Sequence, residues 1–302
     1  MRCGTASVTD SEGNNRFRST TELWLSDTKA KKGMFKSMAF ADFHTHTTYS
    51  DGRHTPEEMV QTAIEMGCYA IGLSGHSPMP FEDTSRVEPF KAEVRRLREA
   101  YHGKIDIYLG IEYDWYYSPI SKDDFDYLIA SIHYMDNGGV WVPTDWDLPR
   151  LQSDLEHFYG GDFLAFARHY YELIGGVADE GPVTVGHFDV ISKNNRDECL
   201  FAEDDPKYLA LAFEAVDRLC EHDAVFEVNT GAMFRYGATR PYPSIPILRH
   251  IRERGARLIL AGDAHERDAL CYRFAETMDY IKEAGFTSVE TLPPMWHGGR
   301  ND

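Results

Sequence analysis

Short apolar runs alternate with longer amphipathic stretches along the chain from about residue 38 onward. The apolar runs are bounded by polar residues and have the length of buried β-strands, whereas helices are usually longer. Seven strands are predicted in this way, at 38–43, 69–74, 105–111, 127–132, 183–187, 224–228 and 257–261.

Helices are predicted between most of these strands. The clearest runs over 55–67, where Thr55, Pro56 and two acidic residues give a start signal and Gly67 gives a stop signal. The other predicted helices are 87–102, 149–173, 206–222, 243–254 and 268–284. The link between the third and fourth strands is short and irregular, so no helix is predicted there.

Near-continuous apolar strands that alternate with helices indicate a parallel sheet covered on both faces. Seven units of one kind favour a closed sheet, so the predicted fold class is α/β, a seven-stranded (βα) barrel. An open, doubly wound sheet is the alternative. No GxGxxG motif follows the first strand, so a dinucleotide fingerprint does not support that alternative.

The N-terminal segment differs in composition from the rest of the chain. Residues 1–37 are polar and rich in Ser, Thr, Lys and Asn, and they are predicted to form a flexible extension. Met34 or Met38 would serve equally well as the first residue. Residues 38–302 are predicted to form a single catalytic domain, since α/β barrels often reach this size.

The chain is acidic, with 31 basic and 49 acidic residues and a formal net charge of −18. This charge argues against nucleic acid as the main partner, because a phosphate backbone needs a basic face. It suits metal cations or a cationic small molecule, although an acidic surface that keeps the protein soluble explains much of it equally well. A small-molecule partner is therefore expected, and the sequence does not indicate an oligomeric state.

The cysteines and the apolar segments bear on location. The five cysteines are scattered, odd in number and without a CxxC pair, as expected for reduced thiols. No apolar run approaches the length of about 20 residues that a membrane span needs. The N-terminus lacks the apolar core of a signal peptide. A cytoplasmic protein without a membrane partner is predicted.

Residues that bind metals recur at the carboxyl ends of the predicted strands. The histidines placed there are His44, His46, His76, His133, His187 and His265. Glu112 and Asp263 share this position, Asp51 lies in the loop after the first strand, and Asn229 follows the sixth strand. The remaining seven of the 13 histidines lie on predicted helices, helix ends or the tail, where a solvated or structural role is expected.

In a β/α barrel the loops after the strands form one mouth, so these nine ligand candidates should converge. In "HTH" and "DAH", alternate side chains of an extended segment point the same way, so each pair can reach one ion. Nine ligands exceed the needs of one ion and predict two or three divalent ions with one bridging carboxylate. Imidazole and carboxylate without thiolate suit Zn, Mn or Fe.

Clustered divalent ions lower the pKa of a bound water and clamp the oxygens of a displacement at phosphorus. Phosphate ester hydrolysis needs such help most, and amide or lactam hydrolysis is the other use of a metal-filled barrel mouth. A phosphatase also needs a cation for the phosphoryl oxygens. Arg235 is the first candidate because its Gly-rich loop follows the sixth strand directly, and Lys193 and Arg240 are the others.

Seven segments of the chain resemble, in order, the PHP (polymerase and histidinol phosphatase) superfamily. They are "DFHTHTTYSDG", "GLSGHSP", "GIEYD", "SIHY", "GHFDVI", "EVNTGAMFRYGATRPYPS" and "GDAH". The resemblance runs from about residue 40 to 290 and implies a distorted seven-stranded barrel. It also implies three metal sites: a first with His44, His46, Glu112 and Asp263, a second with Glu112 as a bridge, His133 and His187, and a third with Asp51, His76 and His265.

Within the superfamily the chain looks most like the histidinol-phosphatase branch, through its full barrel length, "GHFD" and "EVNT…R…YPS". The implied reaction is hydrolysis of L-histidinol phosphate to L-histidinol and phosphate, a step of histidine biosynthesis. An acidic mouth would suit the substrate's ammonium group, with Glu82, Asp83 and Asp114 as candidate partners. The chain departs from compact members in its N-terminal extension and in residues 137–180, which are predicted to carry a loop and a long helix. The segment "VPTDWD" in that region is predicted to cover part of the site.

Three other functions are compatible with a metal-lined barrel. The nearest is a PHP phosphoesterase that acts on another small phosphorylated metabolite or nucleotide. An amidohydrolase-type enzyme is the second, although such enzymes often carry a carbamylated lysine and no lysine occupies a matching strand end here. A metal-binding or sensor protein without turnover is the third, and a complete set of ligands argues against it.

Overall fold

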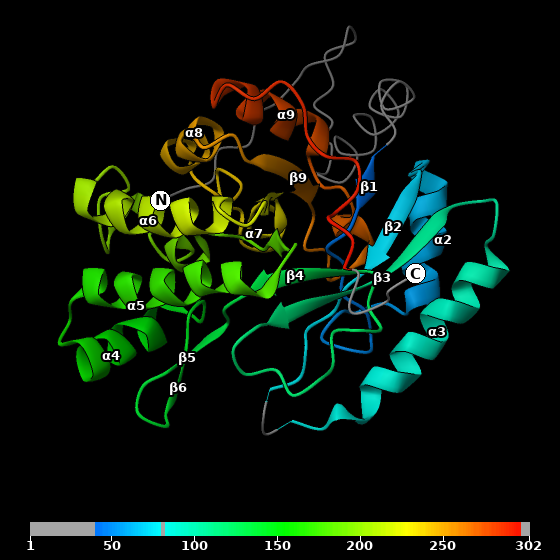
Figure 1. Ribbon diagram of the computed structural model, residues 1–302, viewed down its shortest axis with the longest axis horizontal. Coiled ribbons are helices and arrows are strands. Elements are labelled where there is room, and N and C mark those ends of the chain that lie inside the picture. The colour runs from blue at the N-terminus through cyan, green and yellow to red at the C-terminus, as the bar shows by residue number, and fades with distance from the viewer. Residues whose placement is uncertain (1–39, 80–81, 297–302) are drawn as a thin grey trace, which may run out of the picture. The chain divides into compact units, whose positions relative to one another are not determined.

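Seven parallel strands form one sheet whose spatial order follows the chain (Figure 1). The computed structural model describes residues 40–79 and 82–296. The strands are β1 (Ala41–Asp42), β2 (Ala70–Leu73), β3 (Asp106–Asp114), β4 (Tyr127–Ser131), β7 (Thr184–Val185), β8 (Val225–Asn229) and β9 (Arg257–Ala261). Each coincides with a predicted strand, and the order is β1-β2-β3-β4-β7-β8-β9.

The two edges of this sheet meet just beyond β1 and β9. Thr45 and Ala264 form a parallel bridge there. The Ala264 amide donates to the His44 carbonyl at 3.0 Å, and the His46 amide donates to the Ala264 carbonyl at 2.8 Å. The sheet is therefore a nearly closed barrel, which confirms the predicted fold class.

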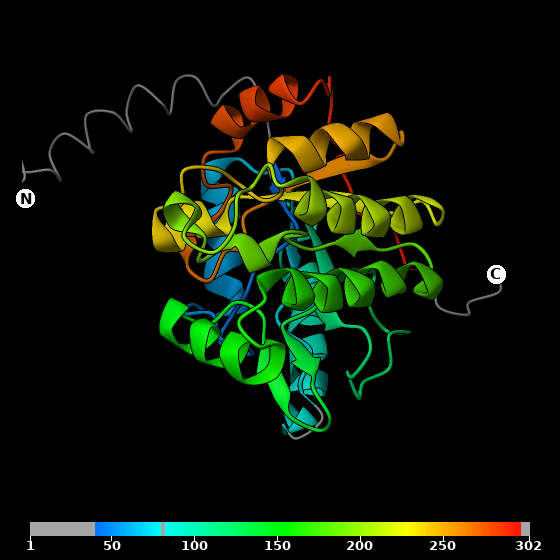
Figure 2. The same ribbon diagram turned by 90° about the vertical axis from the view of Figure 1, so that its left-hand side faces the viewer.

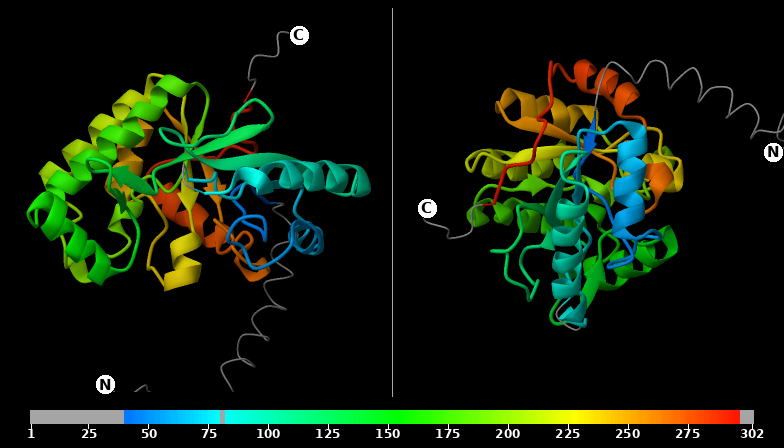
Figure 3. Two further views of the ribbon diagram at one scale, coloured as in Figure 1. Left: turned by 90° about the horizontal axis from the view of Figure 1, so that it is seen from below. Right: turned by 90° about the vertical axis from the view of Figure 1, so that its right-hand side faces the viewer.

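The helices cover the outside of the sheet. They are α2 (Pro56–Met66), α3 (Val87–Ala100), α4 (Leu148–Tyr159), α5 (Phe163–Gly176), α6 (Pro206–Cys220), α7 (Gly231–Tyr236), α8 (Ile245–Glu253) and α9 (Phe274–Glu283). Single 3₁₀ turns lie at η2 (Thr84–Arg86), η3 (Val177–Glu180), η4 (Val190–Ser192), η5 (Arg196–Glu198) and η6 (Arg267–Ala269). Figure 2 shows α5, α6, α8 and α9 stacked in this order along one side, and Figure 3 shows α3 on the side away from α4 and α5.

Helix α2 has the end signals that the sequence predicts. The Thr55 side chain accepts a hydrogen bond from the Glu58 amide, and the Glu58 carboxylate accepts one from the Thr55 amide. This reciprocal capping box satisfies two amides that the helix itself leaves unpaired. Gly67 ends the helix at φ 78, in the left-handed region that glycine enters without a steric penalty.

The structure differs from the local predictions in four places. The predicted helix 149–173 is two helices, α4 and α5, because Gly160 and Gly161 adopt φ values of 62 and 77 and Asp162 caps the second helix. The region predicted as a loop contains an antiparallel hairpin of β5 (Tyr134–Asp136) and β6 (Trp141–Pro143). Helix α7 was not predicted, and the first part of 268–284 is irregular up to Phe274.

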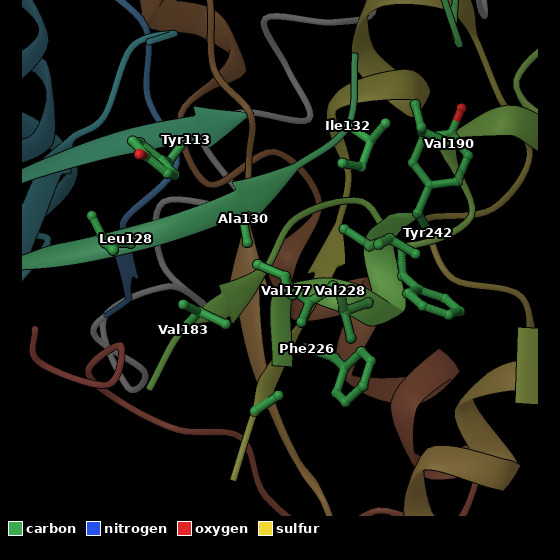
Figure 4. Close-up of a cluster of buried hydrophobic side chains, with 14 of the residues drawn as sticks. Tyr113, Leu128, Ala130, Ile132, Val177, Val183, Val190, Phe226, Val228 and Tyr242 are labelled. Atoms are coloured by element: carbon green, nitrogen blue, oxygen red, sulfur yellow. The ribbon is translucent and has the colours of Figure 1, made fainter. Parts of the chain in front are cut away.

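The core has two parts. One lies between the strands and the helices, and Figure 4 shows Ala130 of β4, Phe226 and Val228 of β8, and Val177 gathered in it. The other fills the barrel interior around Tyr127, whose hydroxyl donates to the Phe43 carbonyl at 2.5 Å.

Two further predictions concern the N-terminal segment and membrane spans. The predicted N-terminal extension, residues 1–37, lies outside the described residues. Within the described residues, no helix has both the length and the apolar character that crossing a membrane would need.

Candidate metal centre

All nine predicted ligand residues lie at one end of the barrel, just beyond or at the ends of the strands. Glu112 is on β3 and forms a parallel bridge with His76, which follows β2. The other ligand candidates follow β1, β4, β7 and β9, and they are His44, His46, Asp51, His133, His187, Asp263 and His265. The structure therefore brings together side chains that are up to 221 residues apart, as 265 − 44 gives for the outermost histidines.

The fully buried Glu112 carboxylate lies at the centre of this cluster. Its Oε1 atom is 2.8 Å from His187 Nε2 and 3.2 Å from His133 Nε2. Its Oε2 atom is 2.9 Å from His76 Nδ1, 3.3 Å from His44 Nε2 and 3.4 Å from His46 Nε2. The two oxygens thus face separate groups of imidazoles, which is the geometry expected of a bridging carboxylate.

Two aspartates face the remaining imidazole nitrogens. Asp263 Oδ1 lies 3.2 Å from His46 Nε2 and 3.7 Å from His44 Nε2. Asp51 Oδ2 lies 3.0 Å from His265 Nε2 and 3.6 Å from His76 Nε2. Asp51 Oδ1 also lies 3.0 Å from His46 Nδ1, so the two nitrogens of His46 face both aspartates as well as Glu112.

Four overlapping groups have one ligand atom per residue within 4.8 Å of one another. They are His46, Asp51, His76 and His265; His44, His187 and Asp263; His44, His46 and Glu112; and His76, Glu112 and His133. The residues of the three predicted sites recur in these groups, but the partition differs. His46 joins the predicted third set, and His76 also joins Glu112 and His133.

The donor set fits divalent ions. Four buried polar atoms of these residues have no hydrogen-bond partner among the described residues: His44 Nε2, His46 Nε2, His187 Nδ1 and Glu112 Oε2. Buried polar atoms are almost always paired, so several orphaned ligand atoms in one cluster point to a group that they would coordinate. Imidazole and carboxylate donors without thiolate match Zn, Mn or Fe.

Electrostatics keep Glu112 and His46 in forms that can bind a cation. Burial acts to raise the pKa of Glu112, but the positive charges of His76, His133 and His44 outweigh it and hold that pKa well below its usual value. Burial, followed by the charges of His265 and His76, lowers the pKa of His46 to about 4. At pH 7 Glu112 is therefore ionised and His46 is neutral.

The three predicted cations occupy different places. Arg235 Nη2 donates to Asp263 Oδ2 at 2.6 Å, and its Nη1 lies 3.2 Å from the His265 ring nitrogens, so it joins the cluster. Lys193 and Arg235 both line a pocket that is also lined by ligand candidates such as Glu112. The Lys193 ammonium donates to the side chain of Asp145 at 3.2 Å and to the Asp145 carbonyl.

Arg240 is the exception. Arg240 is not one of the described residues that line this pocket. Its guanidinium binds Glu203 at 2.8 Å and lies 3.4 Å from Asp189, so two carboxylates hold it in the wall behind the pocket. The structure therefore does not bring Arg240 to the pocket lining that Arg235 and Lys193 share.

The PHP domain family matches residues 42–231, which is more than half of the chain. The chain belongs to the PHP domain family. The matched range contains seven of the nine ligand candidates, and the other two, Asp263 and His265, follow the last barrel strand, β9.

Relatives of this PHP protein carry one activity in their names. A probable histidinol-phosphatase of Deinococcus radiodurans is 28% identical over 264 residues, which cover 82% of this chain and 95% of the relative. The histidinol-phosphatase of Lactococcus lactis is 26% identical over 271 residues, covering 84% and 94%. The similarity therefore spans the whole barrel in both proteins.

A solved structure supports the fold independently. The crystal structure of histidinol phosphate phosphatase from Lactococcus lactis, complexed with zinc, L-histidinol and phosphate, matches this chain with a TM-score of 0.65. The sequence identity is 20%, and the match covers 85% of this chain and 98% of that chain. At this identity the likeness shows that the two proteins share the barrel fold.

The cluster of the PHP domain lies at the base of a pocket of about 780 Å³. Acidic side chains on its wall include Glu82, Asp83 and Asp145, and aromatic side chains include Tyr117 and Trp146. Of the three acids considered for the substrate's ammonium group, Glu82 and Asp83 line the wall. Asp114 is also a lining residue but is buried, and its carboxylate accepts hydrogen bonds from the His133 amide at 2.8 Å and from His133 Nδ1 at 3.0 Å.

Sequence reasoning did not predict that three buried carboxylates support the cluster, although it named Asp114 for another role. Glu227 pairs with His44, Asp114 pairs with His133, and Asp42 accepts hydrogen bonds from the amides of Gly262 and Cys271. A signal for two of them was present, because Glu227 and Asp42 interrupt strands that are otherwise apolar. A charged side chain in a buried strand needs a partner, so such an interruption marks a functional or structural network.

Proposed function

We propose that this protein is a metal-dependent histidinol-phosphatase that hydrolyses L-histidinol phosphate to L-histidinol and phosphate. The observation that carries the proposal is the bridging geometry of Glu112, with separate groups of imidazoles on its two oxygens. Relatives named for this activity, similar over nearly their whole length, support the choice of substrate.

The nine clustered residues would hold two or three divalent ions, zinc, manganese or iron. Such ions supply Lewis-acid stabilisation of phosphoryl oxygens and lower the pKa of water. Glu112 would bridge, with His133 and His187 on one of its oxygens and His44, His46 and His76 on the other. Asp263 and Asp51 would complete the sets. Zinc in the Lactococcus lactis structure supports this ion among the three.

Arg235 is the side chain best suited to hold the phosphoryl group. Burial acts to lower the pKa of Arg235, but the charge of Asp263 outweighs it and raises that pKa, so the guanidinium stays charged. Its planar donors match phosphate oxygens in two-point hydrogen bonds. Because Arg235 is anchored on Asp263, it would orient the ester next to the ligand cluster without a large loss of side-chain entropy.

The pocket wall suits the cationic end of the substrate. Glu82 and Asp83 would attract the ammonium group of histidinol phosphate, and Tyr117 would offer an aromatic face. Lys193 would supply a second cation for the phosphoryl oxygens at the mouth of the pocket, where Asp145 holds its ammonium group. We further propose a role in histidine biosynthesis and a cytoplasmic location.

A substrate panel on purified protein with zinc or manganese added tests this proposal. Histidinol phosphate should be hydrolysed with a kcat/KM at least about 100-fold above that for p-nitrophenyl phosphate or AMP, because substrate-specific contacts are worth several kcal/mol. Dihydroorotate should not be hydrolysed. A preference for AMP or another phosphate ester would favour a different PHP phosphoesterase, and turnover of dihydroorotate would favour amidohydrolase chemistry.

A further inference from the structure

A buried glutamate behind the metal cluster uses both of its oxygens. Glu227 lies on β8 and is 1% exposed. Its Oε1 atom lies 2.8 Å from His44 Nδ1. Its Oε2 atom accepts hydrogen bonds from the His187 amide at 3.1 Å and from the Asn229 side-chain amide at 2.9 Å. The carboxylate therefore contacts two ligand residues from two different strand ends but does not itself face the cluster.

Backbone donors fix the direction of this network. The Gly231 amide donates to Asn229 Oδ1 at 2.9 Å, so the NH₂ group of Asn229 must point to Glu227. The His187 amide is likewise a donor that cannot be reversed. Oε2 of Glu227 thus faces two fixed donors, and only an acceptor can occupy its position.

The network also fixes the proton on His44. Facing the acceptor Oε1 of Glu227, His44 Nδ1 must carry a hydrogen. In the neutral ring that binds a cation, its other nitrogen, Nε2, then presents a lone pair toward Glu112 Oε2 at 3.3 Å and Asp263 Oδ1 at 3.7 Å, where it has no hydrogen-bond partner among the described residues. A neutral ring of the opposite tautomer would present a hydrogen there and could not bind a cation.

We propose that Glu227 is a positioning residue that sets the ring orientation and protonation of His44 and ties this ligand to His187. The inference rests on the proposed metal centre and extends it to a residue outside the ligand set. Asn229 follows the sixth predicted strand, in the place that matches the ligand candidates, and it belongs to the same network. Its Oδ1 atom accepts a hydrogen bond from the Gly231 amide, which fixes its NH₂ group as a donor to Glu227.

The substitution Glu227→Gln separates positioning from packing, because glutamine has the same shape. Its amide oxygen must take the Oε2 position, opposite the His187 and Asn229 donors. Its NH₂ group then faces His44 Nδ1 and donates to it, which moves the ring hydrogen to Nε2. The variant should keep the fold and lose affinity for metal.

The matched control is Asp217→Asn. Asp217 Oδ1 lies 2.7 Å from His250 Nε2, so this is the same kind of carboxylate–imidazole pair, away from the ligand cluster. Zinc affinity of both variants and of the wild type would be measured by competition with a chelator, with thermal unfolding as a check of the fold. Nitrogen chemical shifts of the His44 ring in the zinc-loaded wild type would report which nitrogen carries the hydrogen.

The expected result is zinc affinity lowered about 10- to 100-fold in Glu227→Gln and unchanged in Asp217→Asn, with His44 Nδ1 protonated in the wild type. Wild-type affinity in folded Glu227→Gln, or an unprotonated His44 Nδ1, would overturn the inference while leaving the proposed function intact. If the glutamine variant does not fold, the wild-type shifts alone decide the question. A wild type that binds none of zinc, manganese and iron would overturn the proposed function itself.

Discussion

At the scale of single residues, the centre depends on Glu112, an ionised carboxylate with 0% exposure. Burying such a charge alone would cost several kcal/mol, so it needs compensating cations. Five histidine side chains approach its two oxygens within 3.4 Å. The cluster is therefore stable only when the positive charge around Glu112 is kept, by protonated imidazoles or by bound ions.

The first prediction at this scale concerns one ligand candidate. His44→Ala should lower kcat for histidinol phosphate by about 100-fold or more, because it removes a ligand and leaves Glu227 without its partner. His250→Ala is the control, because His250 packs on Phe213 and pairs with Asp217 away from the cluster. Steady-state kinetics with added zinc would compare the two. Equal activity in both variants would contradict the assignment.

The second prediction separates the candidate cations. Arg235→Gln should lower kcat/KM by about 100-fold with unchanged metal content, as loss of a donor to the phosphoryl oxygens does. Arg240→Gln should instead lower the free energy of unfolding, because it leaves the buried Asp189 without its cation. Kinetics and urea unfolding of both variants would check this. A reversed pattern would favour Arg240 as the cation that binds the phosphoryl group.

Particular residues show which parts of the site can be predicted from the sequence. The nine ligand candidates are found because each follows a strand, and strand ends meet at one edge of a barrel. The partition into ion sites is not predictable in the same way, since it depends on which ring nitrogen of His46 or His76 turns toward which carboxylate. The surroundings of Arg240 are not predictable either, because the conformation of the loop after β8 decides its direction and its partner Glu203 is distant in sequence.

At the scale of elements, periodicity predicts the seven strands because each is apolar and buried. Periodicity fails where single residues determine the backbone conformation. Gly160 and Gly161 in left-handed conformations divide one predicted helix into α4 and α5, and the three-residue strands β5 and β6 are too short to show an alternating pattern. Such short elements depend on tertiary contacts more than on local propensity.

The prediction at this scale concerns the barrel interior. A Cβ atom at Gly72 would lie 2.0 Å from the Tyr127 hydroxyl and 3.0 Å from Phe43 Cα. Gly72→Ala should therefore lower the free energy of unfolding by about 3 kcal/mol through overpacking. Adding Tyr127→Phe should recover part of this loss, so the double variant should be less destabilised than the sum of the single variants. Strict additivity in urea unfolding would show that β2 does not pack on Tyr127.

At the scale of the whole molecule, stability should depend on pH through a buried carboxyl near the barrel wall. Burial raises the pKa of Asp189 from 3.8 to about 6, with Arg240 acting against this change and Glu203 with it. Because of this raised pKa, Asp189 stays protonated in the folded protein at pH values at which it has already lost its proton in the unfolded chain. The stabilisation is thus present below about pH 4 and is lost as the pH rises through about 6.

Asp189→Asn tests this dependence because it removes the titration. The free energy of unfolding of the wild type, relative to that of the variant, should fall by about 1 kcal/mol between pH 5 and pH 7. Urea unfolding of metal-free protein at both pH values gives the difference directly, and the comparison cancels the titration of the other groups. A difference that is constant, or that rises with pH, would show that Asp189 is ionised throughout.

The central claim is that nine side chains from distant parts of the chain form one multinuclear metal centre around Glu112. The most direct test is the amount of metal bound per chain, measured by elemental analysis after zinc or manganese loading and removal of the free ions. We expect two or three equivalents per chain. One equivalent or less in folded protein would contradict the account.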